Sequence, residues 1–171
     1  MPDVPAPWTG RILHVDLTTG EVSHLASTPY IQEYLGGRGI AARLAWDMVA
    51  PGTGAFDAAN PLIFMPGAVV GTPAPSAGRT AICGVSPQTW PHEWYTRSNL
   101  GGHWGAALRY AGYDGLVVTG RAASPVTLQI DDAQVALRDA DHLWGAGLIT
   151  TQRRLRAELP SGTSVLAIGP A

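Results

Sequence analysis

The sequence of 171 residues contains no lysine, a single cysteine and few charged residues of either sign. Its eleven basic residues are all arginines, they form no basic run, and the formal net charge is −2. A nucleic-acid partner is therefore not expected. Charged residues make up 14% of the chain, well below the usual quarter, while hydrophobic residues make up 46%. Much of the surface is expected to be uncharged or covered by another body.

The single cysteine, Cys83, excludes an internal disulfide, a zinc ribbon and an iron–sulfur cluster held by this chain alone. Its apolar surroundings are typical of a core residue, and a dyad with one of the five histidines stays open. No two histidines have i,i+4 spacing, so a metal site made from this chain alone is not favoured.

Long apolar runs are also missing, and none approaches the roughly 18 residues that a membrane-spanning helix needs. The first ten residues lack the basic region and apolar run of a signal peptide. A chain of this length can bury the core of one domain. We therefore expect a cytoplasmic protein without a membrane partner.

Hydrophobic periodicity predicts a mixture of strands and helices. Alternation at 10–17 and 21–25, separated by Thr18-Thr19-Gly20, predicts a hairpin with a positive φ at Gly20. Further strands are predicted at 61–65, 80–85, 116–119, 126–130, 135–137 and 164–168. Helices are predicted at 29–35, with Thr28 as N-cap, and at 40–49, 101–111 and 147–159. Without strict βαβ alternation, an α+β fold is favoured. The halves share an order of elements, so an internal duplication stays open.

Three other segments have simple structural interpretations. Residues 87–98 are predicted to form a loop whose aromatic side chains either make a cover or interface, or fold back onto the core. Asp16 and Asp114 lie at strand–turn boundaries and are interpreted as turn formers. Residues 36–39, Gly-Gly-Arg-Gly, resemble half of a phosphate loop but follow a helix, so a dinucleotide-binding fold is not indicated.

The stretch from Ser76 to Gly120 carries the main functional signal. Arg79 follows a glycine, and Asn99-Leu100-Gly101-Gly102 is expected to open a helix. Glycine permits a close backbone approach, and helix N-terminal N–H groups and an arginine suit a phosphate. The stretch is either a phosphate-ligand cradle or a tightly packed strand–loop–helix corner, and spacing alone favours the corner. No reactive centre accompanies it.

An ordered series of short motifs resembles the N-terminal domain of the tungsten- and molybdenum-pterin aldehyde:ferredoxin oxidoreductase family. The motifs are Gly10-Arg11, Val15-Asp16-Leu17, Thr19-Gly20, 34–39, Pro66-Gly67, Gly71-Thr72, Ala74-Pro75, Gly78-Arg79, Ser86-Pro87, Asn99 with Gly101-Gly102, 111–115, 138–140, 143–145 and 168–171. Each motif is weak alone, and their order carries the resemblance. It identifies residues 1–171 as the N-terminal base domain for the pterin cofactor, with the later domains absent.

The resemblance implies two packed, mostly antiparallel β-sheets with about three helices, forming a base for tungsten or molybdenum held by two pterins. Arg79 is expected beside the pterin, on the side of a [4Fe-4S] cluster held by the absent domains. Asn99, Gly101 and Gly102 are expected at the pterin phosphates, with the Asn99 backbone carbonyl on a magnesium ion. Leu100 replaces the family's serine, so a hydroxyl contact is lost while backbone contacts survive. No catalytic residue is expected here.

The implied function is the oxidation of an aldehyde to a carboxylic acid, with electrons passed through the cluster to ferredoxin. This chain alone is expected to be inactive. Its expected partners are the remaining domains or a partner subunit, and a fragment of a longer enzyme is favoured over a separate subunit. The aromatic segment 88–98 is longer than in better-known members, so the substrate class is not transferred. Two alternatives stay open: a non-catalytic assembly or interaction subunit, and a generic phosphate-ligand binding domain.

Overall fold

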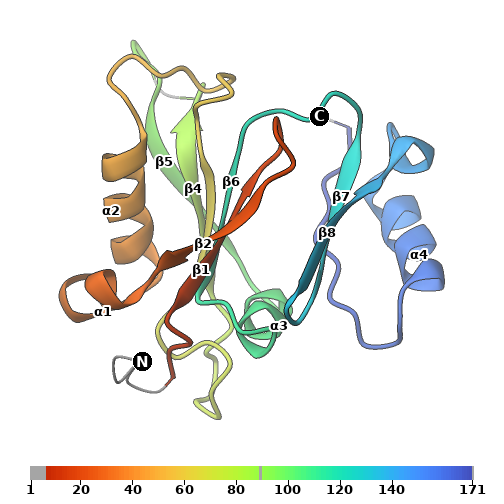
Figure 1. Cartoon of the computed structure of the whole chain (residues 1–171), viewed down its shortest axis with the longest axis horizontal. Coiled ribbons are helices and arrows are strands. Elements are labelled where there is room, and N and C mark those ends of the chain that lie inside the picture. The colour runs from red at the N-terminus through yellow and green to blue at the C-terminus, as the bar shows by residue number, and fades with distance from the viewer. Residues whose placement is uncertain (1–6, 89, 171) are drawn as a thin grey trace. The chain divides into compact units, whose positions relative to one another are not determined.

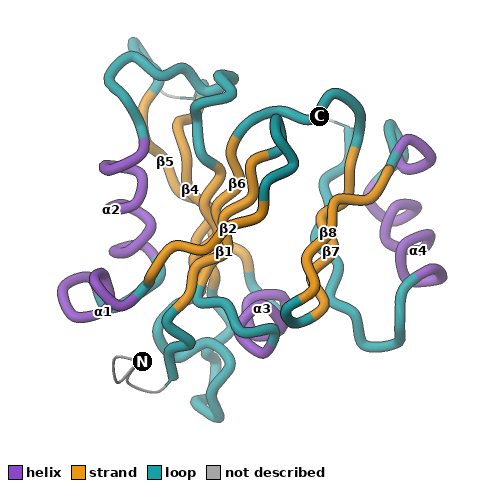
Figure 2. The backbone as a smooth tube through the Cα atoms, viewed as in Figure 1, coloured by secondary structure: helices purple, strands orange, loops and turns teal. Residues whose placement is uncertain are grey.

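The computed structural model describes residues 7–88 and 90–170, and the chain divides into two compact units, 1–122 and 123–171. The first unit contains β1 (Arg11–Asp16), β2 (Val22–Ala26), α1 (Thr28–Tyr34), α2 (Arg38–Met48), β3 (Leu62–Pro66), β4 (Thr80–Ser86), β5 (Trp94–Leu100), α3 (Trp104–Tyr110) and β6 (Gly115–Thr119). The second contains β7 (Val126–Asp131), β8 (Gln134–Asp139), a 3-10 helix (Asp141–Leu143) and α4 (Leu148–Glu158). Figure 2 shows how loops connect these elements.

The strands of the first unit form one sheet in the order β2-β1-β6-β3-β4-β5 (Figure 1). Neighbouring strands are antiparallel except β1 and β6, which run parallel. A second, antiparallel sheet consists of β7 and β8. The predicted α+β class with two mostly antiparallel sheets is confirmed. The described residues contain four α-helices, one at each of the four spans that periodicity predicts and one more than the approximate total of three, and none is both long and apolar enough to cross a membrane.

The main core lies between the six-stranded sheet and α1 and α2, which cover one of its faces (Figure 1). Alternate strand residues point to this face, and the residues of α2 at helical spacing meet them. Ile12, Ile63 and Val117 of the sheet are fully buried here, as is Ile40 of α2. Burying each of these side chains contributes about 2 kcal/mol.

The first hairpin forms as the alternation predicted. The Asp16 carboxylate accepts hydrogen bonds from the N–H groups of Thr18 (2.7 Å) and Thr19 (3.2 Å), so Asp16 is the turn former that was expected. Gly20 has φ +75°, a conformation that glycine adopts without the steric cost of a Cβ. β1 and β2 then pair antiparallel from Arg11 opposite Ala26 to Val15 opposite Val22.

The predicted loop at 87–98 is wrong in its second half, where β5 pairs with β4 along seven residues. The register places Trp94 opposite Ser86 and Leu100 opposite Thr80. The sequence of β5 is rich in aromatic and β-branched or small polar residues, which suit a half-exposed edge strand. Pro87 and Pro91 precede β5 and favour a loop over a strand in the sequence. Residue 89, in the same segment, lies outside the described residues.

Two further expectations need correction. The helix predicted at 29–35 begins one residue earlier, at Thr28, so Ser27 is its N-cap rather than Thr28. The strand predicted at 164–168 is absent from the described chain, where this segment has no regular structure. A strand needs an edge with which to pair, and Ile168 is 88% exposed.

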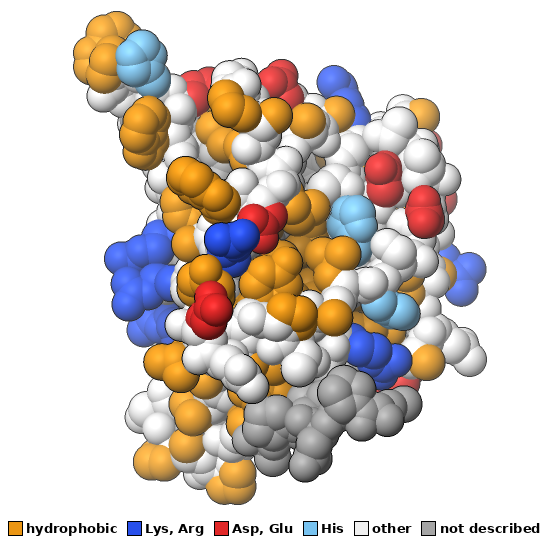
Figure 3. Space-filling view, turned by 60° about the vertical axis from the view of Figure 1, so that its left-hand side comes forward, with side chains coloured by type: hydrophobic (Ala, Val, Ile, Leu, Met, Phe, Trp, Pro, Cys, Tyr) orange, Lys and Arg blue, Asp and Glu red, His pale blue; other side chains and the backbone are white. Residues whose placement is uncertain are grey.

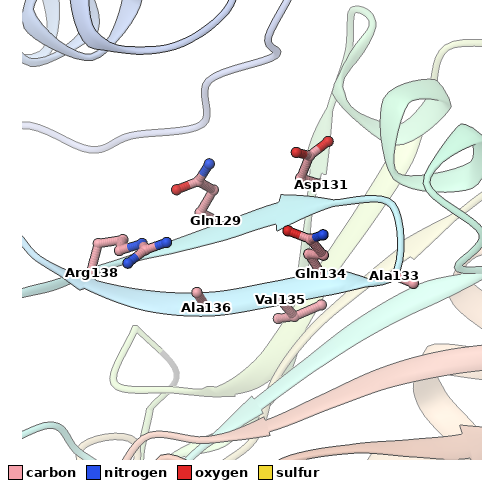
Figure 4. Close-up of a pocket in the computed structure, with 7 residues that line it drawn as sticks. All are labelled: Gln129, Asp131, Ala133, Gln134, Val135, Ala136 and Arg138. Atoms are coloured by element: carbon pink, nitrogen blue, oxygen red, sulfur yellow. The ribbon is translucent and has the colours of Figure 1, made fainter.

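The second unit is a hairpin with a small core of its own. β7 and β8 are joined through Asp132, which has φ +48°, and pair from Val126 opposite Asp139 onward. A cluster of Ala140, Leu143 and Leu155 is buried beside them. On the polar face of the hairpin is a shallow depression of about 410 Å³ (Figure 4). Its lining residues are Gln129, Asp131, Ala133, Gln134, Val135, Ala136 and Arg138.

Candidate functional site

The β4–β5 pairing brings the predicted site residues to one end of the sheet. Asn99 lies in β5 opposite Ala81, and Leu100 lies opposite Thr80, the first residue of β4. Gly101 and Gly102 therefore follow β5 where Gly78 and Arg79 lead into β4. A Cβ at Gly78 would lie 3.0 Å from the carbonyl oxygen of Gly102, so the two segments run backbone against backbone. We call Arg79, Asn99, Gly101 and Gly102 the cradle.

The cradle is open. A Cβ placed on Gly101 or Gly102 would meet no heavy atom within 4 Å, and Gly102 has φ +84°. Arg79 and Asn99 are both exposed. Within the part of the chain that the structure describes, the Arg79 guanidinium has no hydrogen-bond or ion-pair partner. The five donors of this group are thus available to a ligand beside an unobstructed glycine backbone.

The helix after the cradle is shorter than predicted and does not supply the expected anion site. α3 begins at Trp104, its N-cap is His103, and no side chain caps it. Asn99 is therefore a strand residue and not the helix cap that the sequence suggested. With only seven residues, α3 has a weak dipole at its N-terminus.

α3 nevertheless packs against the strands that lead into the cradle. Gly105 packs so closely on the start of β4 that a Cβ would collide with Thr80 Oγ1 and would lie 3.3 Å from Val70. The Trp104 ring lies 5.3 Å from the Phe64 ring of β3, measured between centroids. The cradle therefore rests on a packed strand and helix rather than on a free loop.

Two buried charged residues that the sequence did not single out surround this corner. Arg109 of α3 is 5% exposed, and Asp114, just before β6, is fully buried. Arg109 donates from Nη1 to the carbonyls of Pro7 (3.0 Å) and Ala68 (3.3 Å) and from Nη2 to that of Gly67 (3.2 Å). Burial lowers the pKa of Arg109, and the nearby Asp114 charge opposes that shift. A charged residue on the apolar stripe of α3 was the available signal.

Asp114 is a structural anchor rather than the turn former that the sequence suggested. Its carboxylate accepts hydrogen bonds from the N–H groups of Thr9 (2.8 Å) and Gly10 (2.9 Å) and from the Ser27 hydroxyl. These bonds join the N-terminal segment and the start of α1 to β6. The signal for this role was absent locally, because the partners lie 87 to 105 residues away in sequence.

The glycine turn at 36–39 packs against protein and leaves no room for a phosphate. A Cβ at Gly36 would lie 2.6 Å from the Trp8 ring and 3.1 Å from the Ala68 nitrogen. A Cβ at Gly37 would lie 3.4 Å from the Gly67 Cα. The glycines allow three segments to cross closely. This agrees with the prediction that the turn does not indicate a dinucleotide-binding fold.

Cys83 is a core residue, 2% exposed. Burial raises the pKa of its thiol, and the adjacent Tyr95 and Arg97 oppose this only in part. Burial also raises the pKa of Tyr95, whose hydroxyl has no hydrogen-bond partner among the described residues. A protonated, inaccessible thiol is a poor nucleophile and a poor metal ligand. Within the described residues no three His, Cys, Asp or Glu side chains form a group that could hold a metal.

Two surface depressions of the described chain are lined by residues other than those of the cradle. One is on the β7–β8 hairpin, and the other, of about 370 Å³, follows β4 and β5 near Ile82, Gly84 and Thr96. The cradle is a surface rather than a cavity.

Hydrophobic side chains also gather on the face of the first unit seen in Figure 3, with few charged groups among them. Trp46 on α2 is 80% exposed, and Phe56 and Trp94 are also exposed. This agrees with the low charge of the sequence. The fold and the cradle together define an α+β domain in which the cradle is open to solvent.

The chain matches the family model for the aldehyde ferredoxin oxidoreductase N-terminal domain over residues 12–171. It therefore belongs to the aldehyde ferredoxin oxidoreductase family and represents the N-terminal domain of that family. The family predicted from the motif order is confirmed.

Curated relatives agree. The tungsten-containing aldehyde ferredoxin oxidoreductase of Thermococcus kodakarensis is 38% identical over 164 residues, which are 95% of this chain and 27% of the relative. The aliphatic sulfonate oxidoreductase, WOR-like subunit, of Pyrococcus furiosus is 31% identical over 156 residues, 89% of this chain and 24% of that protein. The chain thus spans about a quarter of the length of these enzymes.

A solved structure has the same fold. It is the active site complex BamBC of benzoyl coenzyme A reductase in complex with 1,5-dienoyl-CoA, with a TM-score of 0.84 and 40% sequence identity. The match covers 88% of this chain and 23% of the chain in that structure.

Proposed function

We propose that residues 1–171 form the cofactor-binding N-terminal domain of a tungsten- or molybdenum-pterin oxidoreductase. The observation that carries this proposal is the open cradle, in a family whose curated relatives are named as tungsten-containing. An arginine that has no partner among the described residues lies at the same sheet end as a glycine pair whose backbone is unobstructed. The arrangement leaves the Arg79 guanidinium and the glycine N–H groups exposed to water, and a phosphorylated ligand would accept hydrogen bonds from them.

The cradle residues fit the chemistry of a pterin with phosphate groups. The Arg79 fork would bind phosphate or ring acceptors in two places at once, which a lysine does not do. The N–H groups of Gly101 and Gly102 would approach a phosphate without a side chain between them. Asn99 lies in the edge strand β5, and its backbone carbonyl would serve a magnesium ion, a cation that prefers oxygen ligands.

This chain would bind and orient the cofactor, and the bound cofactor would supply the two-electron redox chemistry. In the complete enzyme an aldehyde and water would give a carboxylic acid, two protons and two electrons. The electrons would leave through an iron–sulfur cluster, held by other parts of the enzyme, to ferredoxin. The rest of the enzyme would be the partner of the cradle surface, since this chain spans about a quarter of the relatives.

A second candidate reaction is the reduction of an aromatic acyl-coenzyme A. It is favoured by the 40% identity to the benzoyl coenzyme A reductase structure, which is similar to the 38% identity to the aldehyde enzyme. Both reactions would use the same cradle. A non-catalytic assembly subunit is disfavoured, because the intact Arg79 and glycine pair would have no role in it.

The test is the metal and pterin content of the complete enzyme, measured by mass spectrometry. The unaltered protein should contain tungsten or molybdenum with pterin, and Arg79→Met should lose most of both. Arg43→Met is the matched control, because Arg43 is on the surface of α2 and its ion pair with Asp47, at 2.8 Å, lies within that helix. Equal cofactor content in the Arg79 variant and the control would refute the role of the cradle. Absence of metal and pterin from the assembled, unaltered enzyme would favour the assembly subunit.

A further inference from the structure

Arg109 is a buried cation that forms no ion pair with a carboxylate of the described residues. It is 5% exposed on the inner side of α3, and within the described chain its acceptors are three backbone carbonyls. Placing a guanidinium in a protein interior costs several kcal/mol, so a helix position that needed only packing would carry an aliphatic residue. The charge at Arg109 therefore requires an explanation beyond the core.

Two of the three carbonyls that Arg109 binds, those of Gly67 and Ala68, lie in the segment that leads to Arg79. Arg109 Nη2 donates to the Gly67 carbonyl at 3.2 Å, while the Gly67 N–H donates to the Arg79 carbonyl at 3.0 Å. Nη1 binds the next carbonyl, that of Ala68. Gly67 thus connects the buried guanidinium directly to the backbone of Arg79.

Arg109 also belongs to the other half of the cradle. It is on α3, which follows Gly101 and Gly102 after a single residue, His103. Gly78 lies against the Gly102 carbonyl, so both halves meet at this point. The guanidinium is further fixed by the Trp8 ring, whose centroid lies 4.4 Å from Cζ.

We infer that Arg109 is a positioning residue for the cradle: it holds the Gly67–Arg79 backbone against α3, so that Arg79 and the glycine pair face one ligand together. This inference rests on the proposed cofactor-binding function. The planar guanidinium of Arg109 donates hydrogen bonds to the successive carbonyls of Gly67 and Ala68. A lysine at this position would bind these carbonyls only in part, and a methionine would leave both without this donor.

The test compares Arg109→Met and Arg109→Lys with Ser27→Ala in the complete enzyme. Ser27→Ala is the matched stability control, because it removes a buried hydrogen bond to Asp114 in the same unit without touching residues 67–79. The first readout is hydrogen–deuterium exchange at the Gly67 amide, which does not depend on activity or on bound metal. The second readout is tungsten or molybdenum and pterin per polypeptide.

In Arg109→Met, exchange at Gly67 should be about tenfold faster and cofactor content several-fold lower, while Arg109→Lys should fall between it and the unaltered enzyme. Ser27→Ala should lower thermal stability and leave both readouts near the unaltered values. Unchanged exchange at Gly67 in Arg109→Met would overturn the positioning role, whatever the cofactor content. Equal cofactor loss in Ser27→Ala would reduce Arg109 to a general stability residue.

Faster exchange at Gly67, together with an unaltered enzyme that holds no metal or pterin, has a different meaning. It would refute the proposed function, and with it the role of Arg109 toward a cofactor. The two failures are thus distinguishable, since one appears in the exchange rate and the other in the unaltered protein.

Discussion

Replacement of Asp114 by alanine should be among the most destabilising single changes in the first unit. Its fully buried carboxylate accepts three hydrogen bonds, two from backbone N–H groups and one from Ser27. A hydrogen bond to a charged group contributes about 1.5–3 kcal/mol. Because the three bonds share one acceptor and are not additive, we expect a total loss of about 4 kcal/mol. That is a large fraction of the roughly 5–15 kcal/mol of a typical domain.

The matched control is Asp16→Ala, in the first hairpin turn. Asp16 also accepts two backbone N–H hydrogen bonds, but at an exposed turn where water replaces the lost acceptor. We expect a loss of about 1 kcal/mol there. Asp114→Asn keeps the shape and one acceptor oxygen, so it should fall between the two.

The assay is urea unfolding followed by circular dichroism, with hydrogen exchange at β1 and β6 amides reporting the first unit separately. This second probe is needed because the chain has two compact units and its unfolding need not be two-state. If Asp114→Ala lowered the free energy of unfolding no more than Asp16→Ala, the buried hydrogen bonds would not have the role that we assign to them.

The elements with a regular hydrophobic period were predictable from the sequence. The first hairpin, α2 and α4 follow from spacing alone, since each buries one face against its own neighbours. The edge strand β5 did not follow, because Trp94 and Tyr95 come directly after a turn-like segment and the strand has one neighbour only. The segment at 164–168 has strand-like alternation, but alternation alone does not show whether a neighbouring strand is available for pairing, and here the segment forms no strand.

The residues of the candidate site were predictable, while their support was not. Arg79 and the glycine pair stand out by motif order, which does not depend on the register of β4 with β5. Arg109 and Asp114 act through partners 41 to 105 residues away, so their roles exist only once the chain is folded. The local sequence predicts a turn role for Asp114, because an aspartate at a strand–turn boundary is usually a turn former.

Three further changes separate folding from function. Thr80→Val should stabilise the protein by about 1 kcal/mol in urea unfolding, because the Thr80 hydroxyl is buried without a hydrogen-bond partner among the described residues. A loss of stability would contradict this, because it would mean that the hydroxyl forms a hydrogen bond in the folded protein. Gly101→Ala and its control Gly147→Ala should both leave the melting temperature unchanged, because a Cβ at either site would meet no heavy atom within 4 Å. Only Gly101→Ala should lower the metal and pterin content. Equal content in the two variants would show that Gly101 does not belong to the cradle. Burial raises the pKa of Cys83 above its ordinary 9.0 and that of Tyr95 above 10.0, so both groups favour the folded state while protonated. Their contribution is complete below the unfolded values and is lost as the pH rises through the folded ones. Stability measured from about pH 10 to about pH 12 should therefore fall less steeply in Tyr95→Phe than in the unaltered chain, and identical slopes would refute the assigned cause.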